Sequence, residues 1–208
     1  MKVKISEIKR ESLQIINGNW NNLIWGSLVY LSIKFGGESI NKLIFKNNLG
    51  IIIWILLIPL TFGFIKFYTD FMDKALIEIS TIFWVYKNIF AKSVLLHLFV
   101  VAKSLIWGLL FVAPGVVKFI SYSFAPFILL ENPDMIISDV MNQSQKITYG
   151  YKKFILLFHL SFVGWYILSF LTLGLGLLWL LPYHYISHII LYRELSKNSS
   201  VDCIENKT

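Results

Sequence analysis

The feature of this sequence that most limits its fold is an apolar run at 49–68, LGIIIWILLIPLTFGFIKFY, in which Lys66 is the only charged residue. Comparable runs recur along the chain. Their apolar residues follow one another directly, whereas a soluble amphipathic helix has them at every third or fourth position. A helix crosses a bilayer with about 20 such residues, or about 17 at the short end. The sequence therefore predicts an all-α membrane protein.

The composition agrees with a chain whose solvent is lipid. Of the 208 residues, 56% are hydrophobic and 15% are charged, and the mean hydropathy is +0.66. A soluble domain carries about 25% charged residues. The length suits a single membrane-embedded helical domain, 1–195, followed by a polar cytoplasmic tail, 196–208, which we expect to be disordered.

We expect a polytopic transmembrane helical bundle with about six spans. The predicted ranges are about 22–37, 49–68, 94–113, 116–130, 154–173 and 175–192.

Four prolines (Pro59, Pro114, Pro126 and Pro182) lie in apolar segments and predict proline-kinked helices. We expect neighbouring helices to pack around these kinks; hinge points in a moving bundle are the alternative. Pro114-Gly115, where we expect the third span to end, leaves two arrangements open for 94–130. One is a tight hairpin of two spans, and the other is a single kinked, re-entrant element.

Three further segments predict amphipathic helices, and we expect the second and third of them to be interfacial. The first precedes Gly18 and carries Ile5, Ile8, Ile15 and Ile16 roughly on one side. The second, 70–92, has apolar residues at steps of three and four, namely Leu76, Ile79, Phe83, Tyr86 and Phe90. The third, 133–147, begins at Asn132-Pro133-Asp134, where Asn is a favoured N-cap and Pro a favoured first helical residue. A helix with one apolar face lies on the membrane and does not cross it.

The basic residues predict the orientation of the chain. The net charge is +7, but the lysines form no stripe and no base-stacking motif accompanies them, so we do not expect nucleic-acid binding. With six spans, the segments assigned to the inside hold fourteen Lys and Arg residues, and the outer loops hold four, Lys34, Lys42, Lys46 and Lys118. The positive-inside rule then places both termini in the cytoplasm. If 114–130 were re-entrant, the chain would have five spans and the last loops would lie on the opposite sides of the membrane. The excess of Lys and Arg in the inner segments argues against that topology.

The C-terminal half carries a series of short motifs. They are Pro114-Gly115 after a Trp-containing span, Glu131-Asn132-Pro133, Ser144, Leu160-Ser161-Phe162 with Gly164-Trp165, Thr172 with Gly174, and Pro182-Tyr183.

Over about 107–195 this series resembles an uncharacterised family of bacterial integral membrane proteins, domain of unknown function 975. At 147–150 the chain has Ile-Thr-Tyr-Gly, where the family often shows Met-Lys-Gly. The resemblance implies a multi-span protein of the bacterial plasma membrane and supplies no catalytic residues. More distantly, the chain is similar to the membrane portion of some glycerophosphodiester phosphodiesterases, without a recognisable hydrolase part.

Four residues are candidates for contact with a ligand or a lipid. His184 and His188 are four residues apart, so they share one helix face. Two imidazoles do not make a metal site, and histidines bonded to backbone or Tyr hydroxyl groups are the favoured interpretation. Tyr122 either lines a path or bonds between helices.

The fourth candidate, Lys103, lies near the middle of the third predicted span, where a cation costs roughly 2.5–3.5 kcal/mol. It either meets carbonyl groups, a lined cavity or an anionic ligand such as a lipid phosphate, or it snorkels from a helix end. No Asp or Glu falls within a predicted span to pair with it.

The sequence predicts no enzyme and no cofactor. Ser161 and His159 are two residues apart, so they do not face each other on a helix. Gly174-Leu175-Gly176 lacks the lysine and the strand of a phosphate loop. The single cysteine, Cys203, makes a disulfide framework or a cysteine metal site impossible within one chain.

We expect a non-enzymatic membrane scaffold, an accessory protein or a self-protection or envelope-stress factor. Its partners would be the lipid bilayer and a membrane protein, and the oligomeric state is left open. The alternative is a small transporter or channel-like protein for an amphiphile or peptide. A polar cavity that reaches the midplane would favour transport, whereas a core packed with Leu, Ile and Phe would oppose it.

Overall fold

The computed structural model describes residues 4–44, 50–74 and 78–205. These residues form α-helices joined by short turns, which confirms the all-α prediction. In chain order the helices are α1 (Ile5–Ile16), α2 (Trp20–Ile44), α3 (Gly50–Lys74), α4 (Thr81–Asn88), α5 (Phe90–Leu110), α6 (Val112–Ser121), α7 (Ala125–Glu131), α8 (Ile137–Thr148), α9 (Lys152–Leu171) and α10 (Leu177–Glu205).

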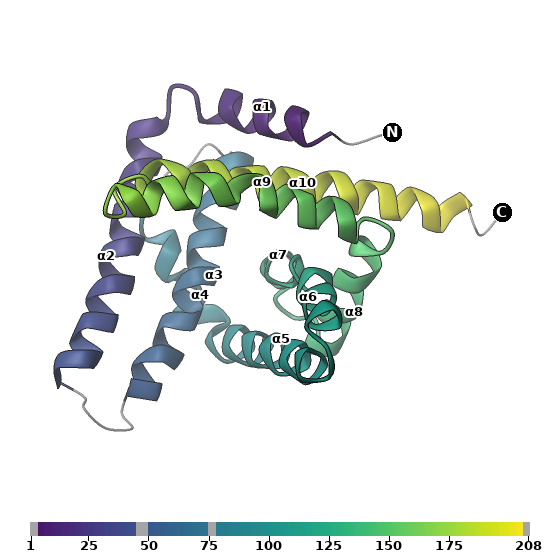
Figure 1. Ribbon diagram of the computed structural model, residues 1–208, viewed down its shortest axis with the longest axis horizontal. Helices are drawn as coiled ribbons and strands as arrows, with labels where there is room; N and C mark the ends of the chain where they lie inside the picture. The colour runs from purple at the N-terminus through teal and green to yellow at the C-terminus, as the bar shows by residue number, and fades with distance from the viewer. Residues whose placement is uncertain (1–3, 45–49, 75–77, 206–208) are drawn as a thin grey trace.

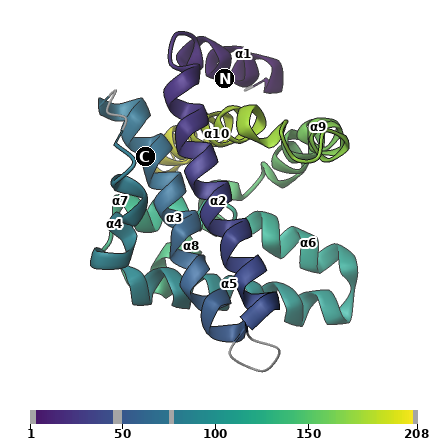
Figure 2. The same cartoon turned by 90° about the vertical axis from the view of Figure 1, so that its left-hand side faces the viewer.

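Three helical hairpins, α2–α3, α5–α6 and α9–α10, run in different directions. In Figure 1, α2 and α3 run from top to bottom, and α9 and α10 run across the view. The turned view in Figure 2 shows α5 and α6 running across, whereas α9 and α10 are seen along their axes. Helices that cross one bilayer are tilted by about 20° on average. The arrangement therefore differs from the side-by-side spans of a simple six-span bundle.

Among the residues that the structure describes, four segments are long and apolar enough to cross a membrane. They are Ile53–Lys74 in α3, Phe90–Leu109 in α5, Ala113–Glu131 over α6 and α7, and Lys152–Leu171 in α9. They correspond to four of the predicted spans. The predicted spans 22–37 and 175–192 are helical, in α2 and α10, but do not belong to this set. Polar side chains such as His184, His188 and Arg193 lower the hydropathy of α10.

The predicted helix ends around Pro114 are wrong. Helix α5 ends at Leu110, Phe111 is extended, and Pro114 lies in the first turn of α6, where its missing N–H leaves no bond unmade. A second break at 122–124 separates α6 from α7, so 116–130 is not one helix. A Cβ on Gly115 would lie 2.7 Å from the Gly108 Cα, so α5 and α6 touch almost backbone to backbone. Helices α5 and α6 therefore form a tight hairpin.

The predicted surface helix 70–92 is also wrong as a single element. Helix α3 continues to Lys74, α4 begins at Thr81, and the chain bends at Ile89 before α5. Ile82 and Val85 of α4 are buried, whereas Phe83 is exposed. Leu76 lies outside the described residues. Helix α4 packs against α3, because Gly63 lets the Ile82 carbonyl approach the α3 backbone.

The predicted helix 133–147 exists but begins later. Asn132 caps the C-terminus of α7, and α8 starts at Ile137 after a turn. Five side chains on one face of α8 are buried, those of Val140, Met141, Ser144, Ile147 and Thr148. The Ser144 hydroxyl donates to the Ser121 carbonyl at 2.9 Å. The apolar face of α8 thus packs on protein.

Helix α10 extends well past the predicted end at 192. It continues to Glu205 and therefore covers most of 196–208, where we expected disorder; 206–208 lie outside the described residues. An ion pair between Arg193 and Asp73, 2.6 Å apart, joins α10 to the end of α3. Pro59 and Pro182 lie inside helices, whereas Pro114 and Pro126 lie in first turns.

We predict that Gly63→Ala destabilises the protein by about 1–3 kcal/mol, as added volume does in packed interiors. The new methyl group would overlap the Ile82 carbonyl, and a backbone atom cannot rotate away. The measurement is the thermal unfolding midpoint in mild detergent. Gly164→Ala on α9 is the matched control, because its Cβ meets nothing within 4 Å. Equal midpoints for the two variants would contradict the close packing of α3 and α4.

Candidate functional site

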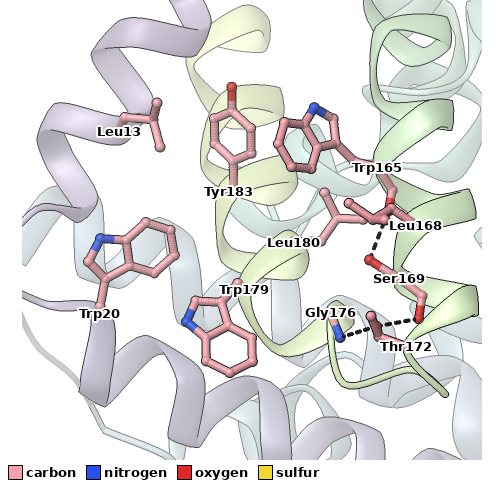
Figure 3. Close-up of a pocket in the computed structure, with 10 residues that line it drawn as sticks. All are labelled: Leu13, Trp20, Trp165, Leu168, Ser169, Thr172, Gly176, Trp179, Leu180 and Tyr183. Atoms are coloured by element: carbon pink, nitrogen blue, oxygen red, sulfur yellow. Dashed lines mark hydrogen bonds between the residues drawn. The ribbon is translucent and has the colours of Figure 1, made fainter.

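A cavity of about 370 Å³ lies where α9 and α10 meet the start of α2. Figure 3 shows aromatic rings from separate helices around it: Trp20 from α2, Trp165 from α9, and Trp179 and Tyr183 from α10. Leu13 of α1 also lines it. We call it the tryptophan cavity.

The turn between α9 and α10 shapes one wall of the tryptophan cavity. The Thr172 hydroxyl donates to the Ser169 carbonyl at 2.9 Å and accepts from the Gly176 N–H at 3.1 Å. The Ser169 hydroxyl donates to the Trp165 carbonyl at 2.8 Å. A Cβ on Gly176 would meet the Ser169 Oγ at 2.7 Å, so this position favours glycine. Because these hydroxyl groups bond to their own hairpin, the wall offers mainly hydrocarbon and aromatic surface.

Three histidines gather between α9 and α10. The ring centroids of His184 and His188 are 5.9 Å apart, and His159 lies 5.7 Å from His184 and 5.0 Å from His188. Phenylalanine rings surround this histidine cluster, from Phe124, Phe127, Phe158 and Phe162.

Two nitrogens of the histidine cluster, His184 Nδ1 and His188 Nε2, are buried without a hydrogen-bond partner among the described residues. The expected bonds to backbone or Tyr hydroxyl groups are therefore not made at these atoms. No group of three or more His, Cys, Asp or Glu among the described residues is arranged to hold a metal ion. The Ser161 hydroxyl donates to the Phe158 carbonyl at 2.6 Å, so it is engaged within its own helix. The arrangement offers aromatic packing and no nucleophile with its base.

Lys9 connects α1 to α9 beside the histidine cluster. Its ammonium group donates to the Ser161 carbonyl at 3.1 Å and lies 4.3 Å from the Phe162 ring centroid. Burial lowers the pKa of the Lys9 ammonium. The Ser187 hydroxyl donates to Ser12 at 2.8 Å and joins α1 to α10. The N-terminal helix is thus part of the folded domain.

A third region, which we call the lysine groove, lies between α5 and the turn before α8. Its volume is about 530 Å³, and Lys92, Leu95, Phe99 and Lys103 line it from one face of α5. The segment 134–138 and Met141 form the opposite side. Lys92 donates to the Pro133 carbonyl at 2.5 Å. Lys103 is exposed and lies seven residues before the last residue of α5.

The four candidate residues do not form one site. Lys103 lines the lysine groove, and His184 and His188 belong to the histidine cluster. Tyr122 is 4% exposed in the turn between α6 and α7 and lines neither the tryptophan cavity nor the lysine groove.

Sequence reasoning missed the tryptophan cavity and the proximity of His159 to His184 and His188. The hairpin itself held a signal for His159, because His159 and His188 lie nearly the same number of residues from Gly174. In a hairpin of two antiparallel helices, residues at equal distances from the turn lie beside each other. No comparable signal predicts that Trp20 and Leu13 reach Trp179, because that contact depends on how the N-terminal helices dock.

Within 4–44, 50–74 and 78–205 the chain is all-α and has four segments suited to cross a membrane, which indicates a multi-pass membrane protein. Residues 109–199 match the model of a family described as protein of unknown function (DUF975). This match confirms the resemblance seen over about 107–195. The chain has no match among curated proteins or solved structures.

We predict that His188→Phe keeps or raises the unfolding midpoint. A buried polar atom without a partner costs about 1–3 kcal/mol, and a phenyl ring removes that atom while preserving contact with Phe124, Phe127 and Phe158. His97→Phe is the control, because His97 is only partly buried and packs edge-on against Trp54. A large loss of stability in His188→Phe alone would contradict this prediction, because it would mean that His188 Nε2 makes a stabilising hydrogen bond.

Proposed function

We propose that this protein is a multi-pass bacterial membrane protein that acts without catalysis, as a scaffold, an accessory protein or a self-protection factor. It would work through contact with lipid and with a membrane protein partner. The observation that carries the proposal is the exposure of its apolar helices. Only 11% of the Phe90–Leu109 segment and 22% of Lys152–Leu171 are buried inside the molecule. Surfaces of this size require lipid or a partner chain to cover them.

The interior supports this proposal over transport. Among the described residues, six of the twelve largest fully buried side chains are Leu or Ile, and the other six are aromatic: Tyr68, Phe64, Phe67, Phe124, Phe158 and Phe162. The tryptophan cavity and the lysine groove are lined mainly by apolar residues. A core packed with Leu, Ile and Phe is what we expect of a structural membrane protein, whereas transport of an amphiphile or a peptide would need a polar cavity that reaches the midplane.

We also propose a multi-pass topology with both termini in the cytoplasm of a bacterial cell. The contact of α1 with α10 supports a common side, because it places the basic residues Lys9 and Arg10 on a helix that packs on α10. Arg193 and Lys197 of α10 add to the same charge bias. Figure 1 shows α1 running along the α9–α10 pair.

The native Cys203 provides the test of orientation, because it is the only cysteine. We predict that a membrane-impermeant maleimide labels Cys203 in inverted membrane vesicles but not in intact spheroplasts. Cys203→Ser combined with Asn47→Cys, in a predicted outer loop, is the matched control and should show the opposite pattern. Labelling of Cys203 in spheroplasts would overturn the cytoplasmic C-terminus.

The test of function is purification of the tagged full-length chain from its native membrane in mild detergent, followed by mass spectrometry of proteins and lipids. We predict a stoichiometric membrane protein partner that is lost when an exposed apolar side chain is shortened. Leu105→Ala on α5 and Leu160→Ala on α9 probe the two surfaces, and both side chains are more than half exposed. Such substitutions change stability by about 0.5 kcal/mol or less.

The same purification separates the alternatives. Loss of the partner in one variant and not in the other would locate the interface on that helix. A chain that is always alone contradicts the scaffold proposal. A solitary chain that carries one enriched amphiphile or peptide would favour the transporter.

A further inference from the structure

We infer that the lysine groove binds an anionic phospholipid, with the lipid phosphate on Lys103 and an acyl chain along Leu95 and Phe99. This inference rests on the membrane embedding of the proposed function and names the lipid class that the protein selects. It follows from the charge of the groove, the spacing of its lysines and the exposure of its walls.

The charged groups of the groove leave one cation available for a ligand. Lys92, Lys103 and Asp134 line it, so two positive charges face one negative charge. Lys92 is held by the Pro133 carbonyl. Lys103 has neither a hydrogen bond nor an ion pair with any residue that the structure describes. An anionic group is therefore the complement of Lys103.

The spacing along α5 assigns different roles to the two lysines. Lys92 and Lys103 share one face of the helix, but at 1.5 Å per residue they are roughly 16 Å apart. One phosphate cannot contact two lysines across that distance. The phosphate therefore belongs at Lys103, and Lys92 holds the turn that forms the far side of the groove.

The surface between the two lysines is apolar and open. Leu95 is 46% exposed, Phe99 48%, and Ile136, across the groove, 68%. Met135 and Ile137 add partly buried apolar surface to the same wall. A free phosphate would leave this surface uncovered, whereas a lipid would place its acyl chain there.

Lipid is favoured over a protein segment because of the position of the groove. It lies on α5, whose apolar segment is mostly exposed and is suited to cross a membrane. The groove is continuous with that lipid-facing surface, so a bilayer lipid reaches it without leaving the membrane. Phosphatidylglycerol, which carries one negative charge at its phosphate, suits a single unpaired lysine.

The test is native mass spectrometry of the purified full-length protein with phosphatidylglycerol and phosphatidylcholine of identical acyl chains. We predict that the wild-type protein binds phosphatidylglycerol about tenfold more tightly, the worth of one charge-assisted contact. Lys103→Gln should lose this preference. Its unfolding midpoint should stay unchanged, because the side chain is exposed and unpaired.

Two matched variants make the result specific. Lys87→Gln removes the same charge from an exposed position on α4 and should keep the preference. Ile136→Asn should weaken the binding of both lipids to a similar degree, because it changes the apolar wall and leaves Lys103 in place.

Three results would overturn the inference. They are equal binding of the two lipids by the wild-type protein, a preference that persists in Lys103→Gln, and an equal loss in Lys87→Gln. A photo-crosslinker at Phe99 that joins two copies of the chain, and not lipid, would also overturn it. None of these results affects the labelling of Cys203 or the recovery of a protein partner, so failure of the lipid site is distinguishable from failure of the proposed function.

Discussion

Packing around helix α10 holds the three hairpins in their crossed arrangement. Its residues contact α1, α2, α3, α8 and α9. The Tyr185 ring packs edge-on against Phe64 and stacks with Tyr68 of α3 at 5.8 Å. Two turns further along, the Tyr192 ring stacks with Phe127 of α7 at 5.3 Å, and its hydroxyl donates to Glu131 at 2.6 Å. A helix that must contact so many partners has little surface left for lipid, which explains why it is less apolar than α5 or α9.

Buried hydroxyl groups of the protein form hydrogen bonds mostly within their own helix. The hydroxyl groups of Ser27, Ser121 and Thr148 each donate to a carbonyl one turn earlier in the same helix. Such bonds add little between helices, because both partners lie in the same helix. Bonds between helices, such as Ser27 with Tyr68 at 2.8 Å, are local additions to aromatic packing. A core of this kind favours a fixed framework, which agrees with a role carried by the outer surfaces.

The sequence predicted the class of fold and some parts of the candidate sites. The run at 49–68 lies in α3, and 154–173 nearly coincides with α9, because long apolar runs indicate helices whatever their neighbours are. Lys103 could be singled out from its apolar surroundings alone. The ends of the helices near Phe111 and Ile136 could not be predicted. Pro114 and Asn132-Pro133 suit more than one position in a helix or turn, and packing selects among them.

What the sequence by itself determined is the helical, membrane-type character of the chain and the DUF975 motifs of its C-terminal part. These properties depend on local composition and on the need of a backbone in lipid to satisfy its own hydrogen bonds. Only the tertiary structure decided that His159 joins His184 and His188, that α4 folds back on α3, and that Lys103 faces the turn before α8. Those contacts join residues far apart in the chain, and they depend on how the crossed hairpins fit together.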